Sequence, residues 1–363
     1  MRSLPITPLM VLFLIGLGGY LGCDPNSIPL PPDSSTPAGT STTYPSSVGT
    51  SAPSSASSSA ASSSPNSATT SSSIPVSTRS NSGGAITMPD RQPSTLLIGS
   101  FNMQRLGPSK LGNSWVMDKF AAIIRRFDVI ALQEITSKDQ RTVPQLLEHV
   151  NADGSNYSYT ISPRIGREAT GYYEQYAFVY DAKRVRSGDQ FSYVVQDDDD
   201  VLHREPFVGR FETITTGQPF TFTLVNIHTD PGEIAYEIDV LADVYINVRQ
   251  FEYPEDDVIL LGDLNASPEQ FQKLGQIPGF EPVIVGIPTN TRKNKIYDNI
   301  VFDRQAGREF TGRAGVLDME QMFRVEMTDA LRISDHMPIW AEFSITEQTG
   351  GYTASYDGAQ LVR

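Results

Sequence analysis

Two polar side chains whose oxygen atoms can bind cations follow an apolar run late in the chain. Residues 258–261 are four consecutive apolar residues, which predicts a buried strand. The run ends at Gly262, and Asp263 and Asn265 come next. Side chains two residues apart in an extended chain share a face, so both would project from the end of a core strand, where α/β folds place their chemistry. The alternative is a plain polar turn, since Gly, Asp and Asn favour turns.

The same pattern recurs at the ends of other predicted strands. The side chains concerned are Asn102, Glu134, His228, Asp263 with Asn265, Asp298, and Asp335 with His336, while Glu174 stands at the start of a further strand. A lone histidine on a strand is usually structural, but two of the four histidines in the chain fall within this set. So many coincidences favour a functional site over a series of turns.

The chemistry that suits these groups is hydrolysis of a phosphodiester. Carboxylate and amide oxygens bind hard divalent cations, so we expect Mg²⁺ or Mn²⁺ as the cofactor. The cation would neutralise charge on the transition state. One histidine can take a proton from water while the other protonates the leaving oxygen. Each histidine needs a carboxylate to orient it and to support its charged form.

The elements that must position these side chains alternate between strand and helix. Apolar spacing predicts helices over residues 115–127, 144–150 and 233–249. Apolar runs predict strands over residues 94–100, 128–134, 157–163, 175–180, 208–215, 220–227, 258–261, 296–302 and 339–345. A strand, helix, strand order at the start of this region is typical of an α/β fold.

Composition limits the partners and the covalent chemistry. The 363 residues suffice for one or two domains, and the net charge is -14. Overall charge would therefore not attract a polyanion, so local basic groups or bound cations would have to do so. The single cysteine, Cys23, excludes a disulfide within the chain and a cysteine-rich zinc site.

Residues 1–23 have the features of an export signal. Arg2 precedes an apolar core over residues 10–21, which is shorter than the ~20 apolar residues that span a bilayer. Gly22 and Cys23 resemble a bacterial lipobox, although Tyr20 departs from its usual leucine. We therefore expect a lipid anchor at Cys23 that holds the chain on the membrane, in the periplasm or at the cell surface. Ordinary secretion is the alternative.

Between the signal and the first strand the chain has almost nothing to bury. Residues 24–94 are rich in Ser, Thr and Pro, a composition that predicts a disordered tether. The folded domain is expected over residues 95–346, and a polar tail over residues 347–363. Within the domain, residues 197–200 are four consecutive aspartates. This run is either a solvated loop or, with Glu205, a structural Ca²⁺ site.

Taken together, the polar residues at the strand ends resemble the endonuclease/exonuclease/phosphatase superfamily, and within it deoxyribonuclease I most closely. The resemblance covers about residues 95–345. It is carried by Asn102, Gln133-Glu134, Tyr172 with Glu174, Arg204-Glu205-Pro206, His228, the run Gly262 to Ala266, Tyr297-Asp298 and Ser334-Asp335-His336. It implies an α/β fold, a four-layer sandwich of two mixed β-sheets flanked by helices.

The resemblance also implies roles for single residues. Glu134 would be the principal metal ligand, with Asn102 and Asp335 nearby. His228 paired with Glu174 would be the general acid and His336 paired with Asp298 the general base, although the two roles could be exchanged. Asp263 and Asn265 would bind phosphate or a second metal opposite Glu134. Tyr172 and Arg204 are the residues predicted to bind substrate, Tyr172 because it matches a tyrosine that lies in the DNA minor groove.

Two features depart from that pattern. Thr136 replaces an arginine that enters the minor groove, and Arg164, Arg167 or Lys138 could compensate. A basic loop over residues 289–295 precedes Asp298 and is either a solvated turn or a contact for the phosphate backbone.

Three functions remain open on the sequence. The first is an endonuclease that cleaves DNA with little sequence preference outside the cytoplasm, acting as a monomer with no protein partner. The second is a phosphodiesterase for phospholipid head groups or small phosphate esters. The third is a catalytically silent, tethered binding module, which the complete set of polar residues disfavours.

Overall fold

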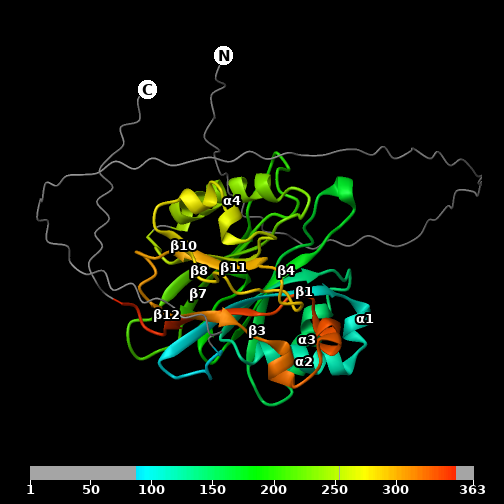
Figure 1. The fold of residues 1–363 in the computed structure, drawn as a ribbon. Helices are drawn as coiled ribbons and strands as arrows, with labels where there is room; N and C mark the ends of the chain where they lie inside the picture. The colour runs from blue at the N-terminus through cyan, green and yellow to red at the C-terminus, as the bar shows by residue number, and fades with distance from the viewer. Residues whose placement is uncertain (1–86, 253, 349–363) are drawn as a thin grey trace, which may run out of the picture. The chain divides into compact units, whose positions relative to one another are not determined.

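Two mixed β-sheets pack face to face, with helices on both outer faces (Figure 1). The structure is a computed structural model that describes residues 87–252 and 254–348. The predicted four-layer α/β sandwich is confirmed. The export signal, Cys23, residues 24–86 of the predicted tether and residues 349–363 of the predicted tail lie outside the described residues.

The first sheet has the strand order β12-β13-β1-β2-β4-β3. Its strands are β1 (Thr95–Leu106), β2 (Val129–Ile135), β3 (Tyr157–Ile161), β4 (Gln175–Asp181), β12 (Phe310–Val316) and β13 (Ile339–Ser344). β1 and β2 are parallel, as the predicted strand, helix, strand start requires, and the other pairs are antiparallel.

The second sheet has the order β10-β11-β9-β8-β7-β5, and β6 pairs with β7. Its strands are β5 (Val185–Arg186), β6 (Ser192–Val194), β7 (Phe207–Thr213), β8 (Thr221–His228), β9 (Val258–Asp263), β10 (Phe280–Pro282) and β11 (Asp298–Asp303). β8 and β9 are parallel. In both sheets the parallel pair is joined by a helical crossover, so the carboxyl ends of its strands meet at one edge.

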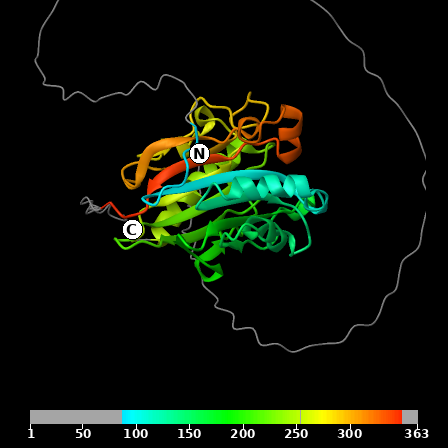
Figure 2. The same ribbon diagram turned by 90° about the horizontal axis from the view of Figure 1, so that it is seen from below.

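Helices cover the outer face of each sheet (Figure 1, Figure 2). The α-helices are α1 (Pro108–Leu111), α2 (Ser114–Ile124), α3 (Thr142–Asn151), α4 (Ile234–Glu252), α5 (Met319–Phe323) and α6 (Met327–Ile333). Short 3₁₀ helices are η1 (Glu168–Thr170), η2 (Asp189–Phe191), η3 (Pro268–Gln270) and η4 (Leu274–Gln276). α2, α3 and α6 share an apolar cluster with the first sheet, and α4 shares one with the second.

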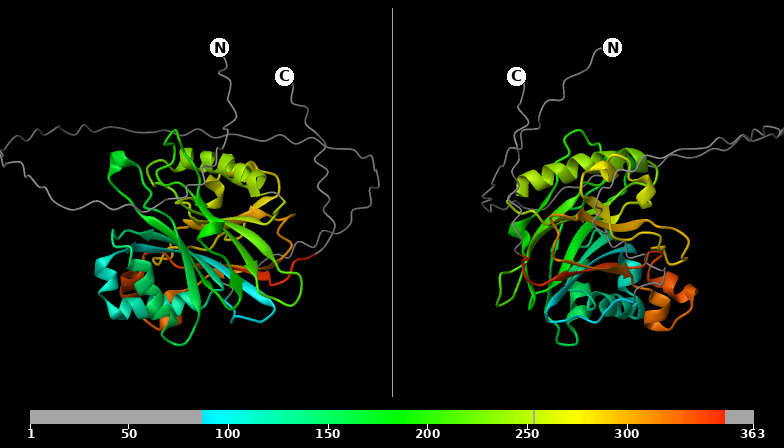
Figure 3. Two further views of the ribbon diagram at one scale, coloured as in Figure 1. Left: turned by 180° about the vertical axis from the view of Figure 1, so that it is seen from behind. Right: turned by 60° about the vertical axis from the view of Figure 1, so that its left-hand side comes forward.

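Three apolar layers separate the four layers of secondary structure, which Figure 3 shows from two sides. The middle layer lies between the sheets and is rich in aromatic rings. There Phe178 of β4 stacks on Phe207 of β7, with ring centroids 5.3 Å apart. This inter-sheet layer fixes the two sheets against each other, and thereby the strand ends that carry the polar residues.

The described fold extends beyond the predicted domain at both ends. Met88 is buried in the core, and the guanidinium of Arg91 forms ion pairs with Asp128 and Asp181. At the other end the backbone N–H of Glu347 donates to the carbonyl of Gln218. Residues 87–94 and 347–348, assigned from composition to the tether and the tail, therefore contact the domain. No helix among the described residues is long and apolar enough to cross a membrane.

Candidate active site

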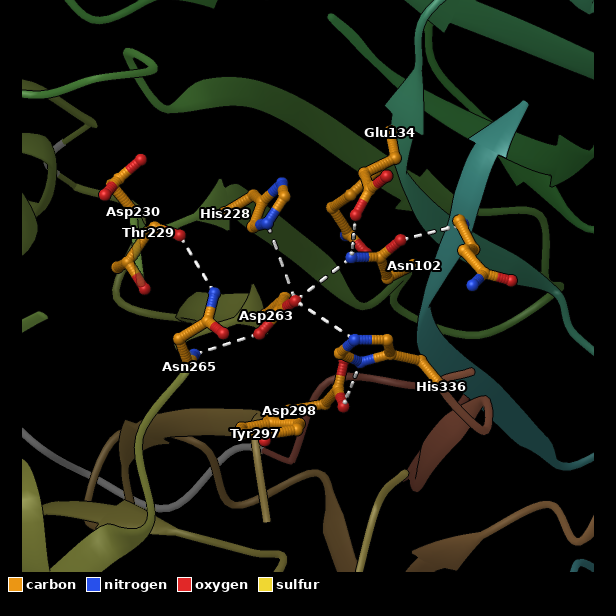
Figure 4. Close-up of polar contacts among 12 residues, drawn as sticks. Asn102, Glu134, His228, Thr229, Asp230, Asp263, Asn265, Tyr297, Asp298 and His336 are labelled. Carbon is orange, nitrogen blue, oxygen red and sulfur yellow. Dashed lines mark hydrogen bonds and ion pairs between the residues drawn. The ribbon is translucent and has the colours of Figure 1, made fainter. Parts of the chain in front are cut away.

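The polar residues of the strand ends converge at one edge of the two sheets (Figure 4). Strand register explains part of the convergence. Asp263 of β9 is the register partner of His228 on parallel β8 and of Asp298 on antiparallel β11. Three residues that are far apart in the sequence thus lie side by side across three neighbouring strands.

His228 is held by Glu174 from the opposite sheet. Its Nδ1 lies 3.0 Å and 3.2 Å from the two carboxylate oxygens of Glu174, which precedes β4 and is fully buried. Burial opposes charge on both groups, but their mutual attraction outweighs it. The attraction between the two groups raises the pKa of His228 and lowers the pKa of Glu174. The pair leaves Nε2 of His228 facing the centre of the site.

His336 has the same arrangement on the other side of the site. Its Nδ1 lies 2.9 Å from Oδ2 of Asp298, and Oγ1 of Thr289 donates to the same oxygen at 2.7 Å. Burial works against the imidazolium, but the nearby Asp298 and Asp263 raise the pKa of His336 to about 10. The ring of Tyr297 lies beside the imidazole, with ring centroids 5.6 Å apart.

Asp263 lies between the two histidines. Its Oδ2 is 3.6 Å from Nε2 of His228 and 3.6 Å from Nε2 of His336. Its Oδ1 accepts from the backbone N–H of Asn265 at 2.9 Å. The position predicted for Asp263 was a corner of the site opposite Glu134. Instead, the carboxylate is the shared centre of two histidine–carboxylate pairs.

Asn102 links Asp263 to Glu134 across the two sheets. Its Nδ2 donates to Oδ2 of Asp263 and to Oε1 of Glu134, each at 3.0 Å. Its Oδ1 accepts from the backbone N–H of Gln104 at 2.9 Å, which fixes which end of the amide is oxygen. Asn102 therefore joins two carboxylates through its amide nitrogen, and its role as a metal ligand stays a prediction.

A backbone irregularity aims Glu134 into the site. Its φ is +60°, which residues other than glycine rarely adopt, and the register of β2 with β4 shifts between Leu132 and Ile135. Such bulges redirect a side chain next to an active site. Oε2 of Glu134 accepts from the backbone N–H of Arg105, whose φ of +58° is also positive.

The donor set fits a hard divalent cation. Burial lowers the pKa of the Lys110 ammonium to about 8. Asp335 and Glu134 lie near this ammonium and oppose the shift. Asp263, Asp298 and His336 offer ligand atoms within 4.8 Å of one another. Glu134, which Asn102 links to Asp263, is the residue that the resemblance predicts as principal metal ligand, and a bound cation would neutralise charge on the phosphoryl oxygens.

Asn265 forms the turn that follows β9. Its φ is +48°, and its Nδ2 donates to the carbonyl of Thr229 at 2.9 Å. The two interpretations of the Gly262 to Ala266 stretch, a strand-end site and a polar turn, therefore both apply. The turn holds Asn265 against the loop that follows His228.

Arg204 is almost fully buried and lies under the ring of Tyr172. It is 7% exposed, its Nε donates to the carbonyl of His228 at 2.8 Å, and its guanidinium lies 5.8 Å from the ring centroid of Tyr172. Nε of Arg204 thus holds the backbone of His228, whereas its Nη2 has no hydrogen-bond partner among the described residues, so the substrate-binding role of Arg204 stays a prediction. Tyr172 is half-buried and remains a candidate for substrate contact.

Two of the arginines proposed to replace a minor-groove arginine are held by the protein. Arg164 donates to the carbonyls of Thr136, Ser137 and Tyr173. Arg167 contacts His203, Glu233 and the carbonyls of residues 200 and 201. Both stabilise loops beside the site, whereas Lys138 is exposed, as are Arg292 and Lys295 in the basic loop.

The aspartate run at residues 197–200 does not gather with Glu205 into a group of three ligands among the described residues. Oδ2 of Asp197 instead accepts from the backbone N–H of Leu202 at 2.7 Å. Burial raises the pKa of Glu205, and Asp197 and Asp200 add to the effect. The run behaves chiefly as a loop that caps its own backbone.

Three further residues position the site, and none of them was predicted as a site residue. Lys110 donates to the carbonyls of Met103 and Ile333 at 2.7 Å, Thr289 holds Asp298, and Ser334 Oγ donates to the carbonyl of Asn102. Ser334 also accepts from the backbone N–H of His336 at 3.1 Å. Ser334 belongs to the Ser334-Asp335-His336 motif and Thr289 begins the basic loop at residues 289–295, whereas no sequence signal pointed to Lys110.

Two histidine–carboxylate pairs around a central carboxylate, with Glu134 joined to that carboxylate through Asn102 on a two-sheet sandwich, are the groups that a metal-dependent phosphodiesterase needs. The chain belongs to the Endonuclease/Exonuclease/phosphatase family, whose model matches residues 99–281.

Named relatives agree with this assignment. The chain is 35% identical to human Deoxyribonuclease-1-like 1 over 262 residues, covering 69% of this chain and 85% of the relative. It is 36% identical to Deoxyribonuclease gamma of Rattus norvegicus over 291 residues, covering 74% and 89%. The catalytic domain of human Nocturnin with bound sulfate superimposes with a TM-score of 0.49 at 15% identity, covering 71% of this chain and 97% of that one.

Proposed function

We propose that this chain is an exported, metal-dependent endonuclease that cleaves DNA with little sequence preference. The observation that carries the proposal is the placement of Nε2 of both His228 and His336 at 3.6 Å from Asp263. Two proton-handling groups then face one point, as acid and base must in a displacement at phosphorus. The names of the relatives, both deoxyribonucleases, support DNA as the substrate.

Charge also bears on how DNA would bind. The chain carries a net charge of -14, so attraction depends on local groups. The exposed Lys138, Arg292 and Lys295 and the half-buried Tyr172 are the candidates. We propose Mg²⁺ or Mn²⁺ as the reaction metal, because the ligands are oxygen atoms of carboxylates.

The test is a plasmid-nicking assay on the purified chain with Mg²⁺, Mn²⁺ or Ca²⁺, each with and without chelator. Sphingomyelin and a small bis-phosphoester are assayed in parallel. We expect relaxed circles, then linear DNA, only with metal, and no activity in His336→Ala. The variant His149→Ala serves as a matched control, since His149 lies on α3 away from the site. If the chain hydrolyses sphingomyelin or the small ester and leaves the plasmid intact, DNA is not the substrate and the alternative phosphodiesterase function holds.

We also propose that Cys23 carries a lipid that anchors the chain, with residues 24–86 as a tether. The support is the sequence around Cys23. In a bacterial host the chain should fractionate with membranes and take up a labelled fatty acid, and Cys23→Ser should abolish both. Incorporation of label that persists in Cys23→Ser would contradict the anchor.

A further inference from the structure

A second cluster of carboxylates lies at the end of β9 that is opposite to the active site. Asp257 directly precedes β9, whose last residue is Asp263. The strand is 6 residues long, so the two aspartates are separated by about 20 Å of extended chain. Glu309, which precedes β12, and Glu347, which follows β13, join Asp257 there. One ligand atom of each of the three lies within 4.8 Å of the others.

Two oxygen atoms of this cluster are buried without a hydrogen-bond partner. They are Oδ1 of Asp257 and Oε2 of Glu309, and the two residues are 3% and 2% exposed. The other oxygen of Glu309 accepts from the backbone N–H of Gln348 at 2.6 Å. Buried carboxylate oxygens are normally hydrogen-bonded or bound to a cation, so two orphans facing one cluster indicate a missing ligand.

Within residues 87–252 and 254–348, Asp257, Glu309 and Glu347 form no ion pair with a basic side chain. Glu255 and Asp256 stand next to Asp257 and form with it a second, overlapping group of ligand atoms. Burial raises the pKa of Asp257 to about 10, and each charged group that adds to the shift is another carboxyl: Glu309, Asp256, Glu255 and Glu347. Burial, with Glu309, Glu255 and Asp256 nearby, raises the pKa of Glu347 to about 7. A cation would remove this repulsion.

We propose that Asp257, Glu309 and Glu347 form a structural binding site for a hard divalent cation, with Ca²⁺ as its preferred ligand. Every candidate donor in the cluster is a carboxylate oxygen, the ligand type that Ca²⁺ takes, and Ca²⁺ tolerates the irregular geometry of ligands from separate segments. Mg²⁺ demands a near-ideal octahedron and keeps more of its water.

The role of the cation follows from the segments that it joins. Glu309 and Glu347 flank β12 and β13 of the first sheet, while Asp257 leads into β9 of the second. A bound cation would fasten the two sheets together at this end, together with the chain that follows β13. At about 20 Å from Asp263 it would stabilise the fold without taking part in hydrolysis.

The test compares Ca²⁺ binding by the metal-free chain and by Glu309→Gln. Binding is followed by calorimetric titration, and stability by the change in Tm on addition of Ca²⁺. We expect Glu309→Gln to lose one bound Ca²⁺, or to bind it at least about tenfold more weakly, and to lose most of the rise in Tm. Glu148→Gln, an exposed carboxyl on α3, is the control for one lost charge and should behave as the wild type.

A second variant covers failure of the first to fold. Glu347→Gln changes a half-buried residue at the edge of the cluster and should show the same loss. With saturating Mg²⁺, both variants should hydrolyse phosphodiesters at the wild-type rate, because the active site is intact. Equal Ca²⁺ stoichiometry and equal shifts in Tm in the wild type and both variants would overturn the proposal. A Tm that rises as much with Mg²⁺ as with Ca²⁺ would overturn the preference for Ca²⁺.

Discussion

The side-chain amide of Asn102 donates to Oδ2 of Asp263 at 3.0 Å, which joins β1 of one sheet to β9 of the other at the edge that carries the active site. The same amide nitrogen donates to Glu134. Two carboxylates from different sheets are thereby kept at a fixed separation before any cation binds. The hydrogen bonds of one buried amide thus set the geometry of the acidic half of the site.

Loss of this bridge should lower the rate without unfolding the protein. Asn102→Ala removes both hydrogen bonds and leaves Asp263 with the Asn265 backbone N–H and the two histidines but no link to Glu134, so we expect kcat/KM to fall by about 10–100-fold. Steady-state hydrolysis at saturating Mg²⁺ measures the effect. Asn102→Asp should be worse, because it adds a third negative charge. An Asn102→Ala enzyme with unchanged kcat/KM would show that the carboxylates are positioned by other contacts.

Removal of either histidine should abolish most of the activity. His228→Ala and His336→Ala each delete a group that transfers a proton, which is worth about 10²–10⁴-fold in rate. Single-turnover rates on a plasmid substrate measure the loss, and circular dichroism checks the fold. Glu174→Gln and Asp298→Asn keep the shape of the pairs but remove the charge, and should lose a smaller factor. Near-normal rates in both alanine variants would refute the acid–base assignment.

The His228–Glu174 pair should contribute stability that depends on pH. The folded-state pKa of His228 is raised above its ordinary value of 6.5 by Glu174, so the pair stabilises the fold below pH 6.5. This contribution is lost as the pH rises through the raised pKa. The free energy of unfolding of the metal-free wild type, less that of His228→Asn, should therefore decline as the pH increases above 6.5.

Urea unfolding at a series of pH values measures that difference. His149→Asn is the control, because its contact with Asp118 is at the surface, where ion pairs contribute little. A difference for His228→Asn that is constant from pH 5.5 to 8.5 would be inconsistent with a stabilising ion pair in the folded state.

Gly262 is required by the backbone at the end of β9. Its φ is +148°, and a Cβ atom there would lie 2.0 Å from the carbonyl oxygen of Ile227 on the neighbouring strand. Gly262→Ala should therefore destabilise the protein by about 3 kcal/mol or more, since backbone and strand would both have to shift.

Gly286→Ala provides the comparison for that measurement. Gly286 also has a positive φ, +69°, but nothing lies within 4 Å of the position of an added Cβ. Gly286→Ala should therefore lower the free energy of unfolding by only about 1 kcal/mol. Urea denaturation of the two variants measures both values. Equal losses would mean that the strained φ, and not the contact with Ile227, accounts for the glycine.

Local signals in the sequence located most strands and most of the polar residues of the site, while the four layers were implied by the resemblance. Apolar runs that end in Asp, Glu, Asn or His are local signals, and the side-chain period of a strand says which residues project together. The strands at residues 258–261 and 128–134 were found in this way. β12 was missed because its sequence, FTGRAGV, has two glycines and an arginine, and its place beside β13 depends on pairing with a distant strand.

The tertiary structure alone decided which atoms face each other. Asp263 was found as a candidate, but its place between two histidines depends on the register of β8, β9 and β11, which no local signal encodes. Arg204 was expected at the substrate from the resemblance of Arg204-Glu205-Pro206, and only packing shows that its Nε is held by the carbonyl of His228. Asp257, Glu309 and Glu347 are separate acidic residues in the sequence. Only the packing of the two sheets, which brings chain segments together over long sequence distances, makes them one cluster.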